Sequence, residues 1–461
     1  MGSGVRGPST PITSFQVART RTTPGNPAKT VVTGFAIAIL VGATLLMLPI
    51  STSGRGGAPF LTSLFTATSA ICVTGLTVVD TAVYWTEFGQ AVILLMIQVG
   101  GIGIMTGASL LFLGISRRLG LQRRLIAQAE TKALNLGDLR RVLFGVILFS
   151  ILTELAATTI LSIRFWAGGD SFGTGLWRGL FHAVSAFNNA GFALFSDNLS
   201  AYVTDPTVSI TIAVAVIAGG IGFPVWIALR RDPRRPSRWN LHVKITLVTT
   251  AALLGFGTIA LTAVEWGNDG TLGPLGVPGK LLAGFFAAVM PRTAGFNSIN
   301  YENMHPEGLL ITDMLMFVGG GSASTAGGIK VTTFALLAMM AWAEMRGRSD
   351  VQAFRRRVPI AAQRQALAIA FASVNLVVLG ALALMASSPF DFSRTLFEAI
   401  SAFATVGLST NLTPLFSDVG HSVLIGLMFL GRVGPLTLAI ALVLREHAQR
   451  FRYPEERPLV G

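Results

Sequence analysis

Four glycines in this sequence each follow a phenylalanine by ten residues, within short segments of small and polar residues. The segments read "FTATSAICVTGL", "FHAVSAFNNAGF", "FFAAVMPRTAGF" and "FEAISAFATVGL", and their glycines are Gly75, Gly191, Gly295 and Gly407. Because glycine adopts positive φ at little steric cost, such a stretch can turn successive carbonyl oxygens to one side. Four copies around one axis would form rings of carbonyl oxygens, which suit a dehydrated monovalent cation.

The sequence predicts that three consecutive residues of each segment supply these oxygens. They are Val73, Thr74 and Gly75; Asn189, Ala190 and Gly191; Thr293, Ala294 and Gly295; and Thr405, Val406 and Gly407. Only the last set has the Thr-Val-Gly core of potassium-channel filters, so four unequal copies predict a weaker or less selective filter than four identical ones. Some side chains could assist at the edge of the filter or could instead bond to local backbone: Thr74, Asn189, Thr293, Thr405, Asn297 and Ser409.

The composition indicates an integral membrane protein. Of the 461 residues, 51% are hydrophobic and only 12% are charged, whereas soluble domains carry roughly 25% charged residues. Apolar stretches of about 20 residues recur along the chain, which predicts membrane-spanning helices. We expect helices at residues 30–50, 86–115, 141–165, 206–229, 241–265, 308–342, 364–387 and 419–445.

Four shorter segments lie between the two helices of each successive pair, at residues 59–78, 175–195, 279–297 and 393–409. Each is too short, or too polar at its end, to cross a bilayer, so we expect it to enter and leave on one side. Of the 35 Lys and Arg residues, 27 lie in the two terminal tails and in the connections at 117–141, 230–244 and 346–364. The positive-inside rule therefore predicts a multi-pass protein of the cell membrane whose two termini are cytoplasmic.

A second glycine pattern follows each segment: "VGGIG" at 99–103, "AGGIG" at 218–222, "VGGGS" at 318–322 and "LGRVG" at 430–434. The chain thus contains four similar units of helix, re-entrant segment and helix, all in one orientation. The predicted fold is an all-α integral membrane protein with four parallel helix–pore-loop–helix repeats in a pseudo-fourfold arrangement around a central pore. The predicted parts are a cytoplasmic tail at 1–29, four repeats with their cytoplasmic connections at 30–116, 117–230, 231–343 and 344–446, and a cytoplasmic tail at 447–461.

These patterns resemble the Trk/Ktr/HKT superfamily of potassium uptake proteins, and most of all its KtrB-type bacterial membrane subunits. The likeness covers nearly all of residues 30–445 and rests on the four segments, the downstream glycines and the loop "GGGSASTAGGIK". It implies uptake of potassium by a channel-like subunit, with sodium as a candidate coupling ion in symport. It also implies a homodimer and a cytosolic nucleotide-binding regulatory ring of the KtrA/TrkA type.

The loop at 319–330 interrupts an otherwise apolar stretch, and the resemblance implies that it is an intramembrane gate just below the filter. A continuous helix would lose roughly 1 kcal/mol per glycine there, which favours an irregular loop; the alternative is a glycine-rich packing face. Lys330 would bond to carbonyls of this loop or reach the cytoplasm. The candidate gate residues are Gly319, Gly320, Gly321, Ser322, Ala323, Ser324, Thr325, Ala326, Gly327, Gly328, Lys330 and Arg432.

Five other polar or charged residues stand out in apolar surroundings. Arg432 lies in the middle of the last predicted span, where a charge costs roughly 2.5–3.5 kcal/mol. The resemblance implies that it lies under the filter and slows cations, and the alternative is a buried structural pair. We expect Glu154 to pair between helices or lie near the outer face, Asp313 to lie at the outer surface, and His182 to pack beside its half-helix. Glu398 would attract cations to the pore mouth or bond locally.

Other classes of protein find less support in the sequence. It has no H-E-x-x-H motif, no Ser-centred nucleophile elbow and no acidic cluster, which argues against an enzyme. The single cysteine, Cys72, excludes an internal disulfide. Without a dinucleotide or P-loop motif we expect no organic cofactor on this chain. The net charge of +13 fits the cationic cytoplasmic loops of a membrane protein, so we expect no nucleic-acid partner. These basic loops suit a regulatory protein or anionic membrane lipids. The alternatives are an alternating-access cation symporter or a less selective sodium/potassium translocator, although parallel repeats favour a pore.

Overall fold

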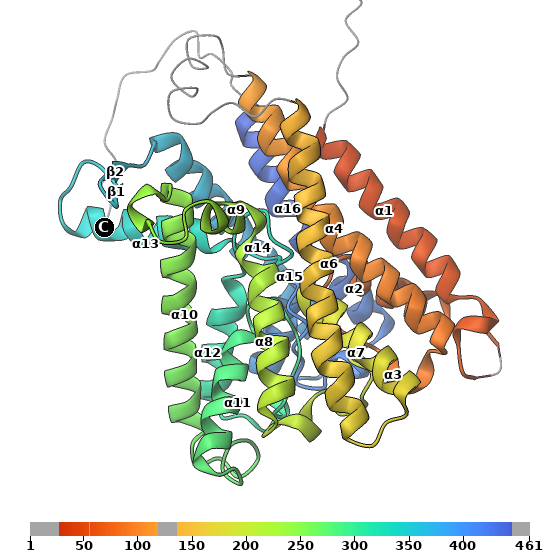
Figure 1. The fold of residues 1–461 in the computed structure, drawn as a ribbon. Helices are drawn as coiled ribbons and strands as arrows, with labels where there is room; N and C mark the ends of the chain where they lie inside the picture. The colour runs from red at the N-terminus through yellow and green to blue at the C-terminus, as the bar shows by residue number, and fades with distance from the viewer. Residues whose placement is uncertain (1–26, 55, 119–135, 445–461) are drawn as a thin grey trace, which may run out of the picture.

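The structure is a computed structural model that describes residues 27–54, 56–118 and 136–444. Long and short helices surround a buried centre (Figure 1). Most of the predicted tail at 1–29, the tail at 447–461 and much of the connection at 117–141 lie outside the described residues. The α-helices are α1 Pro27–Leu46, α2 Phe60–Ile71, α3 Thr81–Tyr84, α4 Glu87–Arg118, α6 Leu136–Ala167, α7 Phe172–Phe187, α8 Pro206–Ile221, α9 Phe223–Arg231, α10 Leu241–Glu265, α11 Val277–Val289, α12 Pro306–Phe317, α13 Val331–Met345, α14 Ile360–Ser387, α15 Phe392–Phe403 and α16 Asp418–Leu444.

Short elements connect these helices. Single 3₁₀ turns occur at Pro49–Ser51, Ser200–Tyr202, Pro236–Arg238, Tyr301–Asn303 and Thr413–Leu415. Strands β1 Gln352–Ala353 and β2 Arg356–Arg357 pair as an antiparallel hairpin between α13 and α14. The sequence analysis did not anticipate this hairpin, whose two turn residues are non-glycine residues with positive φ, namely Phe354 and Arg355.

Most predicted helices lie close to their expected positions. α10 covers the predicted range 241–265, while α6 and α14 begin several residues earlier than expected. Three described helices are long and apolar enough to cross a membrane: Phe144–Ala167 within α6, α10 and α14. Their outward faces carry large apolar side chains such as Ile259 and Phe371, which are largely exposed in the isolated chain. An apolar outer surface of this kind indicates contact with lipid.

The prediction of one helix over residues 206–229 is wrong. α8 ends at Ile221, α9 begins at Phe223, and the two helices are bent by 95°. Gly222 between them has φ +97°, which no helix accommodates, and Pro224 in the first turn of α9 has no backbone N–H to donate. The residues "GFP" at 222–224 are typical of a helix break, but the prediction gave more weight to the apolar residues around them.

The predicted stretch at 308–342 is also not one helix, and here the sequence analysis had expected an interruption. α12 ends at Phe317 and α13 begins at Val331. The residues between them, called loop 318–330 below, are irregular apart from a bridge that pairs Val318 with Ile329.

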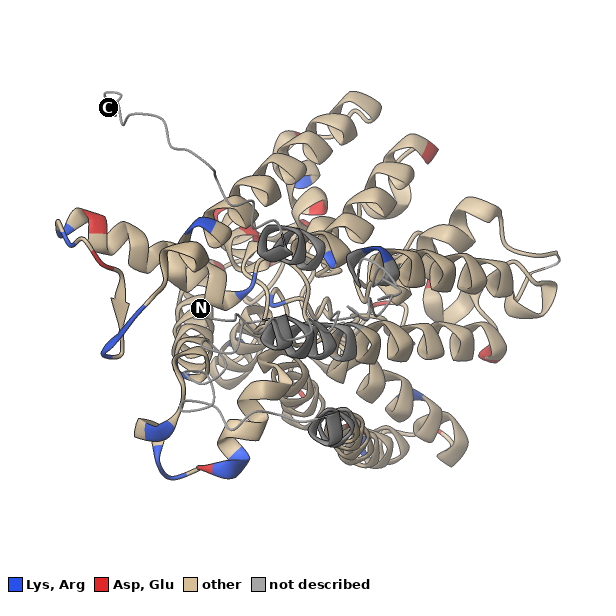
Figure 2. Ribbon diagram, turned by 90° about the horizontal axis from the view of Figure 1, so that it is seen from above, with Lys and Arg blue, Asp and Glu red and all other residues tan. Residues whose placement is uncertain are grey.

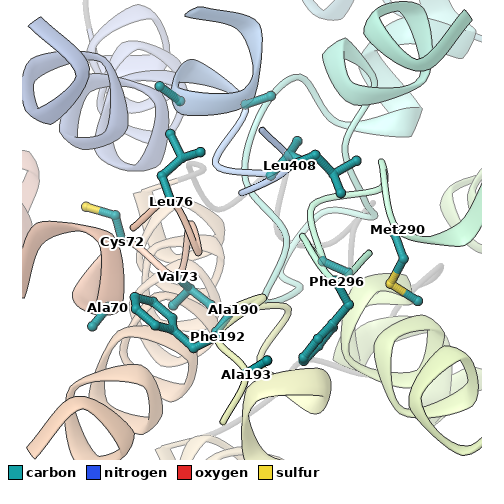
Figure 3. Packing of buried hydrophobic residues seen from close by; sticks show 14 of the residues in the cluster. Ala70, Cys72, Val73, Leu76, Ala190, Phe192, Ala193, Met290, Phe296 and Leu408 are labelled. Atoms are coloured by element: carbon teal, nitrogen blue, oxygen red, sulfur yellow. The ribbon is translucent and has the colours of Figure 1, made fainter. Parts of the chain in front are cut away.

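The short helices α2, α7, α11 and α15 form the buried centre of the bundle. Each carries a fully or almost fully buried phenylalanine at its middle: Phe65, Phe181, Phe286 and Phe397. Around them the core contains mainly small and apolar side chains, part of which Figure 3 shows from close by. The four predicted re-entrant segments thus lie inside the bundle, where the longer helices shield their polar backbone from the surroundings.

Candidate functional site

Each of the four short helices ends just before a glycine that has positive φ. The glycines are Gly75 (φ +97°), Gly191 (+72°), Gly295 (+72°) and Gly407 (+92°). The residue two positions before each glycine also has positive φ although it is not glycine, namely Val73, Asn189, Thr293 and Thr405. The φ sign therefore alternates along 73–75, 189–191, 293–295 and 405–407, called glycine segments 1 to 4 below. Such alternation turns successive carbonyls in one direction.

Backbone contacts join the four glycine segments in a closed cyclic order. A methyl group added at Gly75 would overlap the carbonyl oxygen of Ala190, and one at Gly191 would meet that of Ala294. Added at Gly295 it would overlap the oxygen of Val406, and at Gly407 that of Thr74. Segment 1 therefore abuts segment 2, segment 2 abuts 3, 3 abuts 4, and 4 returns to 1. Only glycine permits approach this close, and Figure 3 shows the loops side by side around one centre.

Serines on the short helices hold three of these segments in place. Ser69 and Ser401 occupy equivalent positions, and their hydroxyls accept hydrogen bonds from the N–H groups of Gly75 (3.0 Å) and Gly407 (3.1 Å). Ser185 at the same position in α7 instead donates to the carbonyl of Phe192 (2.8 Å). The third helix has a valine there, so the sequence already shows that segment 3 lacks this support.

Two further side chains, one on α15 and one on α7, accept hydrogen bonds from the chain just after segments 4 and 2. The carboxylate of Glu398 accepts hydrogen bonds from the Thr410 N–H (2.8 Å) and from the Thr413 hydroxyl (2.6 Å). His182 occupies the equivalent position in α7, and its Nε2 accepts from the Leu194 N–H (3.3 Å). Both side chains are fully buried, so Glu398 bonds locally rather than attracting ions from solvent, and His182 packs beside its helix as expected.

Of the six predicted edge groups, Asn189 bonds to Thr325 of loop 318–330, and the other five divide into two kinds. Asn297 and Ser409 form local bonds, to the Ile299 carbonyl and to the Glu398 carboxylate respectively. In contrast, three hydroxyls within the glycine segments are buried and have no hydrogen-bond partner among the described residues, those of Thr74, Thr293 and Thr405. Buried polar atoms without partners are uncommon in proteins, and a water or an ion would complete the bonding of these three. The state is not confined to the glycine segments, because Thr68 and Thr395 on the short helices share it.

Loop 318–330 docks on the break between α8 and α9. The Gly321 N–H donates to the carbonyl of Gly220 (2.8 Å), and the Phe223 N–H donates to that of Ala323 (3.3 Å). A methyl group at Gly222 would collide with the Ser322 carbonyl oxygen or its neighbours. The two irregular regions of the bundle therefore support each other through backbone contacts that require small residues.

The same loop touches three of the four glycine segments. The Thr325 hydroxyl lies 2.8 Å from the side-chain amide of Asn189 in segment 2. A methyl group at Gly319 would contact Thr293 of segment 3 at 3.3 Å, and one at Gly327 would overlap the Thr405 hydroxyl of segment 4. The loop thus lies directly against the ring of segments, and a change in its conformation would alter their surroundings.

Three cations, the buried Arg432 and Arg292 and the partly buried Lys330, bond to carbonyl oxygens of this loop. Arg432 on α16 donates to Thr325 (2.5 Å), and it also reaches Gly100 of α4 (3.5 Å). Lys330 donates to Ala326 (2.5 Å), so of the two alternatives for this residue the structure has the bond to the loop. Arg292 donates to the Gly319 carbonyl (3.1 Å). The role of Arg292 was not predicted, although Arg292 is the only charged residue directly beside a glycine segment in the sequence.

Two further acidic residues are buried among the helices, and the predicted position of one of them is wrong. Glu154 accepts hydrogen bonds from Gln98, Ser150 and Asn188, so it pairs between helices, as one alternative held. Asp313 was expected at the outer surface, but its side chain is buried within α12. That helix begins at Pro306, so Asp313 lies two turns from its start and not at its exposed end.

A helical bundle with an apolar outer surface and irregular backbone at its centre is characteristic of a membrane transport protein. Residues 28–453 match the family model of TrkH, described as cation transport protein. The chain belongs to this family, whose members are transporters and not enzymes.

Curated relatives match almost the whole chain. The Ktr system potassium uptake protein B of Bacillus subtilis is 42% identical, over 94% of this chain and 97% of its own length. The protein of the same name from Vibrio alginolyticus is 39% identical, over 95% of each chain. The potassium/sodium uptake protein NtpJ of Enterococcus hirae is 36% identical, over 95% of this chain and 97% of its own.

A solved structure shares the fold. The crystal structure of the potassium transporter TrkH from Vibrio parahaemolyticus superimposes with a TM-score of 0.70, at 16% sequence identity. The match covers 92% of this chain and 86% of that one. The arrangement of helices described above is therefore that of a known transporter fold.

Proposed function

We propose that this protein takes up potassium across the cell membrane through a central pore, and that glycine segments 1 to 4 form its selectivity filter. The observation that carries the proposal is the closed cyclic contact of four glycines, each with positive φ and each against the next segment's carbonyl. The names of two relatives, potassium uptake proteins of the Ktr system, support potassium as the transported ion.

The arrangement offers a physical route to cation binding. An unliganded ion inside the membrane would be prohibitively unstable, so backbone oxygens must replace its hydration shell. The short helices α2, α7, α11 and α15 all end next to the glycine segments. Each helix C-terminus contributes roughly half an elementary negative charge, which favours a cation between them. The hydroxyls of Thr74, Thr293 and Thr405 would complete the oxygen lining.

We further propose the repeat architecture that such a pore requires. In it, four parallel helix–pore-loop–helix repeats surround one axis, with the divisions at 30–116, 117–230, 231–343 and 344–446. Each of the four repeats pairs a longer helix with a short buried one: α1 with α2, α6 with α7, α10 with α11, and α14 with α15. The many basic residues of the connections support the cytoplasmic placement of these loops and of both termini.

Loop 318–330 would act as the gate of this pore. Three bonds support this proposal, from the loop to Asn189, Arg292 and Arg432, together with its contacts to Thr293 and Thr405, because they hold a glycine-rich loop against the glycine segments. Arg432 and Lys330 both hold carbonyls of the loop, which supports a closed conformation held by two cations. Their positive charges would also oppose the passage of a cation while the loop is in place.

A less selective sodium/potassium translocator is the second candidate, and one observation favours it. The third segment lacks the serine that supports its counterparts, and its Gly295 N–H reaches only the Met290 carbonyl at 3.4 Å. A filter in which one of the four segments is held less firmly would discriminate less well between ions of different size. The name of the Enterococcus relative, a potassium/sodium uptake protein, agrees with this possibility. The breaks in α8/α9 and α12/α13 are compatible with an alternating-access symporter as well.

The charge on the protein surface indicates which face binds partners. Many Lys and Arg residues lie on loops that project from the bundle (Figure 2). We propose that this face binds a cytosolic nucleotide-binding regulatory ring of the KtrA/TrkA type, that the protein works as a homodimer, and that sodium acts as a coupling ion. The exposed arginines there are Arg230, Arg231, Arg234, Arg235, Arg238, Arg346, Arg348, Arg355, Arg356, Arg357 and Arg364.

One experiment tests the function directly. The purified protein is reconstituted into liposomes, and fluxes of potassium, rubidium and sodium are measured with and without the regulatory ring. Potassium and rubidium fluxes that exceed the sodium flux by roughly tenfold or more would support a carbonyl filter. Equal fluxes of all three ions would favour the less selective translocator, and the absence of any cation flux would refute both. Single-channel currents recorded from the reconstituted protein would distinguish a pore from a carrier, because a carrier transports too few ions to produce them.

A further inference from the structure

A buried polar cluster joins three helices next to glycine segment 2. Its centre is Glu154 on α6, which is only 6% exposed. The carboxylate accepts hydrogen bonds from Gln98 Nε2 of α4 (3.1 Å to each oxygen) and from the Ser150 hydroxyl one turn earlier on α6 (2.9 Å). Its Oε1 also accepts from Asn188 Nδ2 (3.2 Å), and Asn188 follows directly after α7. The cluster therefore fastens the end of a short helix to two longer ones.

Asn188 connects this cluster to the glycine segment. It is fully buried and stands immediately before residues 189–191 in the chain. The same Nδ2 lies 2.8 Å from Gln98 Oε1 and 2.9 Å from the Val184 carbonyl oxygen, so acceptors on α4, α6 and α7 all hold this amide. Because buried polar networks of this kind rigidify their members, the backbone at Asn188, and with it the start of segment 2, has little freedom to move.

Segment 2 depends on this support more than segments 1 and 4 do. In those two segments a serine hydroxyl accepts a hydrogen bond from the glycine N–H, whereas the equivalent Ser185 donates to the Phe192 carbonyl instead. The place of Asn188 is taken in the other segments by Cys72, Arg292 and Ala404, none of which has a side-chain amide. The contact with a buried carboxylate therefore distinguishes the start of segment 2.

The space for Asn188 depends on a glycine of α4. A methyl group added at Gly101 would overlap Asn188 Oδ1. One added at Gly103, two residues further along the same helix, would meet no atom of the described residues within 4 Å. The Asn188 amide thus fits between the Glu154 carboxylate on one helix and a residue without a side chain on another.

We propose that Glu154 is a positioning residue of the filter, which fixes the start of glycine segment 2 through Asn188 and on which ion selection therefore depends. The inference rests on the proposed function, since it requires the glycine segments to be the filter. N–H and O–H donors face both oxygens of Glu154, so the carboxylate orients protein groups and does not bind the ion itself. Groups that orient a ligand-binding residue often matter nearly as much as that residue.

The first variant replaces the carboxylate by an amide of the same size. In Glu154→Gln one acceptor oxygen becomes a donor, and that donor would face Gln98 Nε2, which is itself a donor. We expect the ratio of potassium to sodium flux in liposomes to fall by roughly fivefold. The double variant Glu154→Gln/Gln98→Glu exchanges the two groups, so that Asn188 again faces acceptors on both helices. It should recover most of the lost selectivity, and a double variant no better than Glu154→Gln would contradict the proposal.

Glu265→Gln is the matched control for the loss of a buried carboxylate. Glu265 is 1% exposed and accepts hydrogen bonds from the Asn268 amide (2.6 Å), the Thr271 hydroxyl (2.7 Å) and the His305 N–H (3.0 Å). None of these partners belongs to a glycine segment. Both single variants should unfold at a lower temperature than the native protein, but Glu265→Gln should select ions as the native protein does. Equal loss of selectivity in the two variants would show that instability alone lowers it, and would overturn the proposal.

A second pair of variants tests the same support from α4, and does so even if Glu154→Gln does not fold. Gly101→Ala should displace Asn188 and lower the ratio of potassium to sodium flux, whereas Gly103→Ala should leave the ratio unchanged. If folded Gly101→Ala selects ions like the native protein, the proposal is overturned while the filter itself stands. Equal fluxes of the two ions through the native protein would instead overturn the filter, and this inference with it.

Discussion

The helices that follow the four glycine segments differ sharply although they carry the same glycine motif. After segments 1 and 4, α4 and α16 run unbroken for 32 and 27 residues. After segments 2 and 3, the chain breaks, at Gly222 between α8 and α9 and at loop 318–330 between α12 and α13. The two breaks lie against each other and exchange backbone hydrogen bonds. One side of the bundle is therefore built from continuous helices, and the other from two interrupted ones.

The continuous and the interrupted helices differ because of the atoms that surround the glycine motif, as well as because of the residues within it. Gly103 and Gly222 occupy the same place in the motif. A methyl group at Gly103 would meet no atom of the described residues within 4 Å, whereas one at Gly222 would meet the Ser322 carbonyl. Proline alone does not break these helices, since Pro435 lies inside α16. The interrupted pair thus depends on mutual contact, which makes it the natural place for a conformational change.

The comparison is tested most strongly by the matched pair Gly222→Ala and Gly103→Ala. Alanine at Gly222 must adopt a φ that only glycine readily reaches, which costs about 1–3 kcal/mol. At Gly103, inside a helix, the same change should gain up to about 1 kcal/mol. We expect a lower unfolding temperature for Gly222→Ala and an equal or higher one for Gly103→Ala. Similar unfolding temperatures for both variants would mean that α4 and the α8/α9 break tolerate a side chain equally well, and the comparison would fail.

Deletion of Ala323 to Gly327 tests whether the interrupted side contains the gate. Without these residues the loop cannot reach Asn189 or Thr405, so cation flux in liposomes should rise by roughly tenfold or more. Size-exclusion chromatography and the unfolding temperature would establish that the variant is folded. Flux that stays the same or falls in a folded variant would remove the loop from gating.

Arg432→Ala tests the link between the two sides, because Arg432 extends from the continuous α16 to the interrupted loop. Loss of its bond to Thr325 should shift the loop toward the open state, which would raise flux or change the apparent potassium affinity by roughly fivefold. The exposed Arg238→Ala, measured without the regulatory ring, provides a control with the same loss of charge. Transport kinetics like those of the native protein would show that Arg432 has only a structural role.

Ser401→Ala should have the smallest effect, confined to the continuous side. It leaves the Gly407 N–H without its partner, which costs about 0.5–1.5 kcal/mol and should lower both the unfolding temperature and the preference for potassium over sodium. Ser422→Ala, on exposed α16 surface, is the matched control. If both serine variants select ions equally well, the hydroxyl does not hold the segment in place.

Local signals in the sequence were sufficient for much of the site. The positions of Gly75, Gly191, Gly295 and Gly407 followed from spacing, and their positive φ followed from the physical chemistry of glycine. The interruption at 318–330 followed from helix propensity. The break at Gly222 was missed because the surrounding residues are strongly apolar and the same glycine motif at 99–103 lies within a continuous helix. The position of Asp313 was predicted wrongly because hydropathy did not show where α12 begins.

The sequence by itself determined the class of protein, the four glycine segments and the irregular loop, because composition, φ preference and helix propensity act over a few residues. Only the tertiary structure decided which segment abuts which, which carbonyl each buried cation holds, and which polar atoms are left without partners. Arg432 reaches a carbonyl 332 positions away in the chain. Such pairings depend on how whole helices pack, and no local pattern of residues records that.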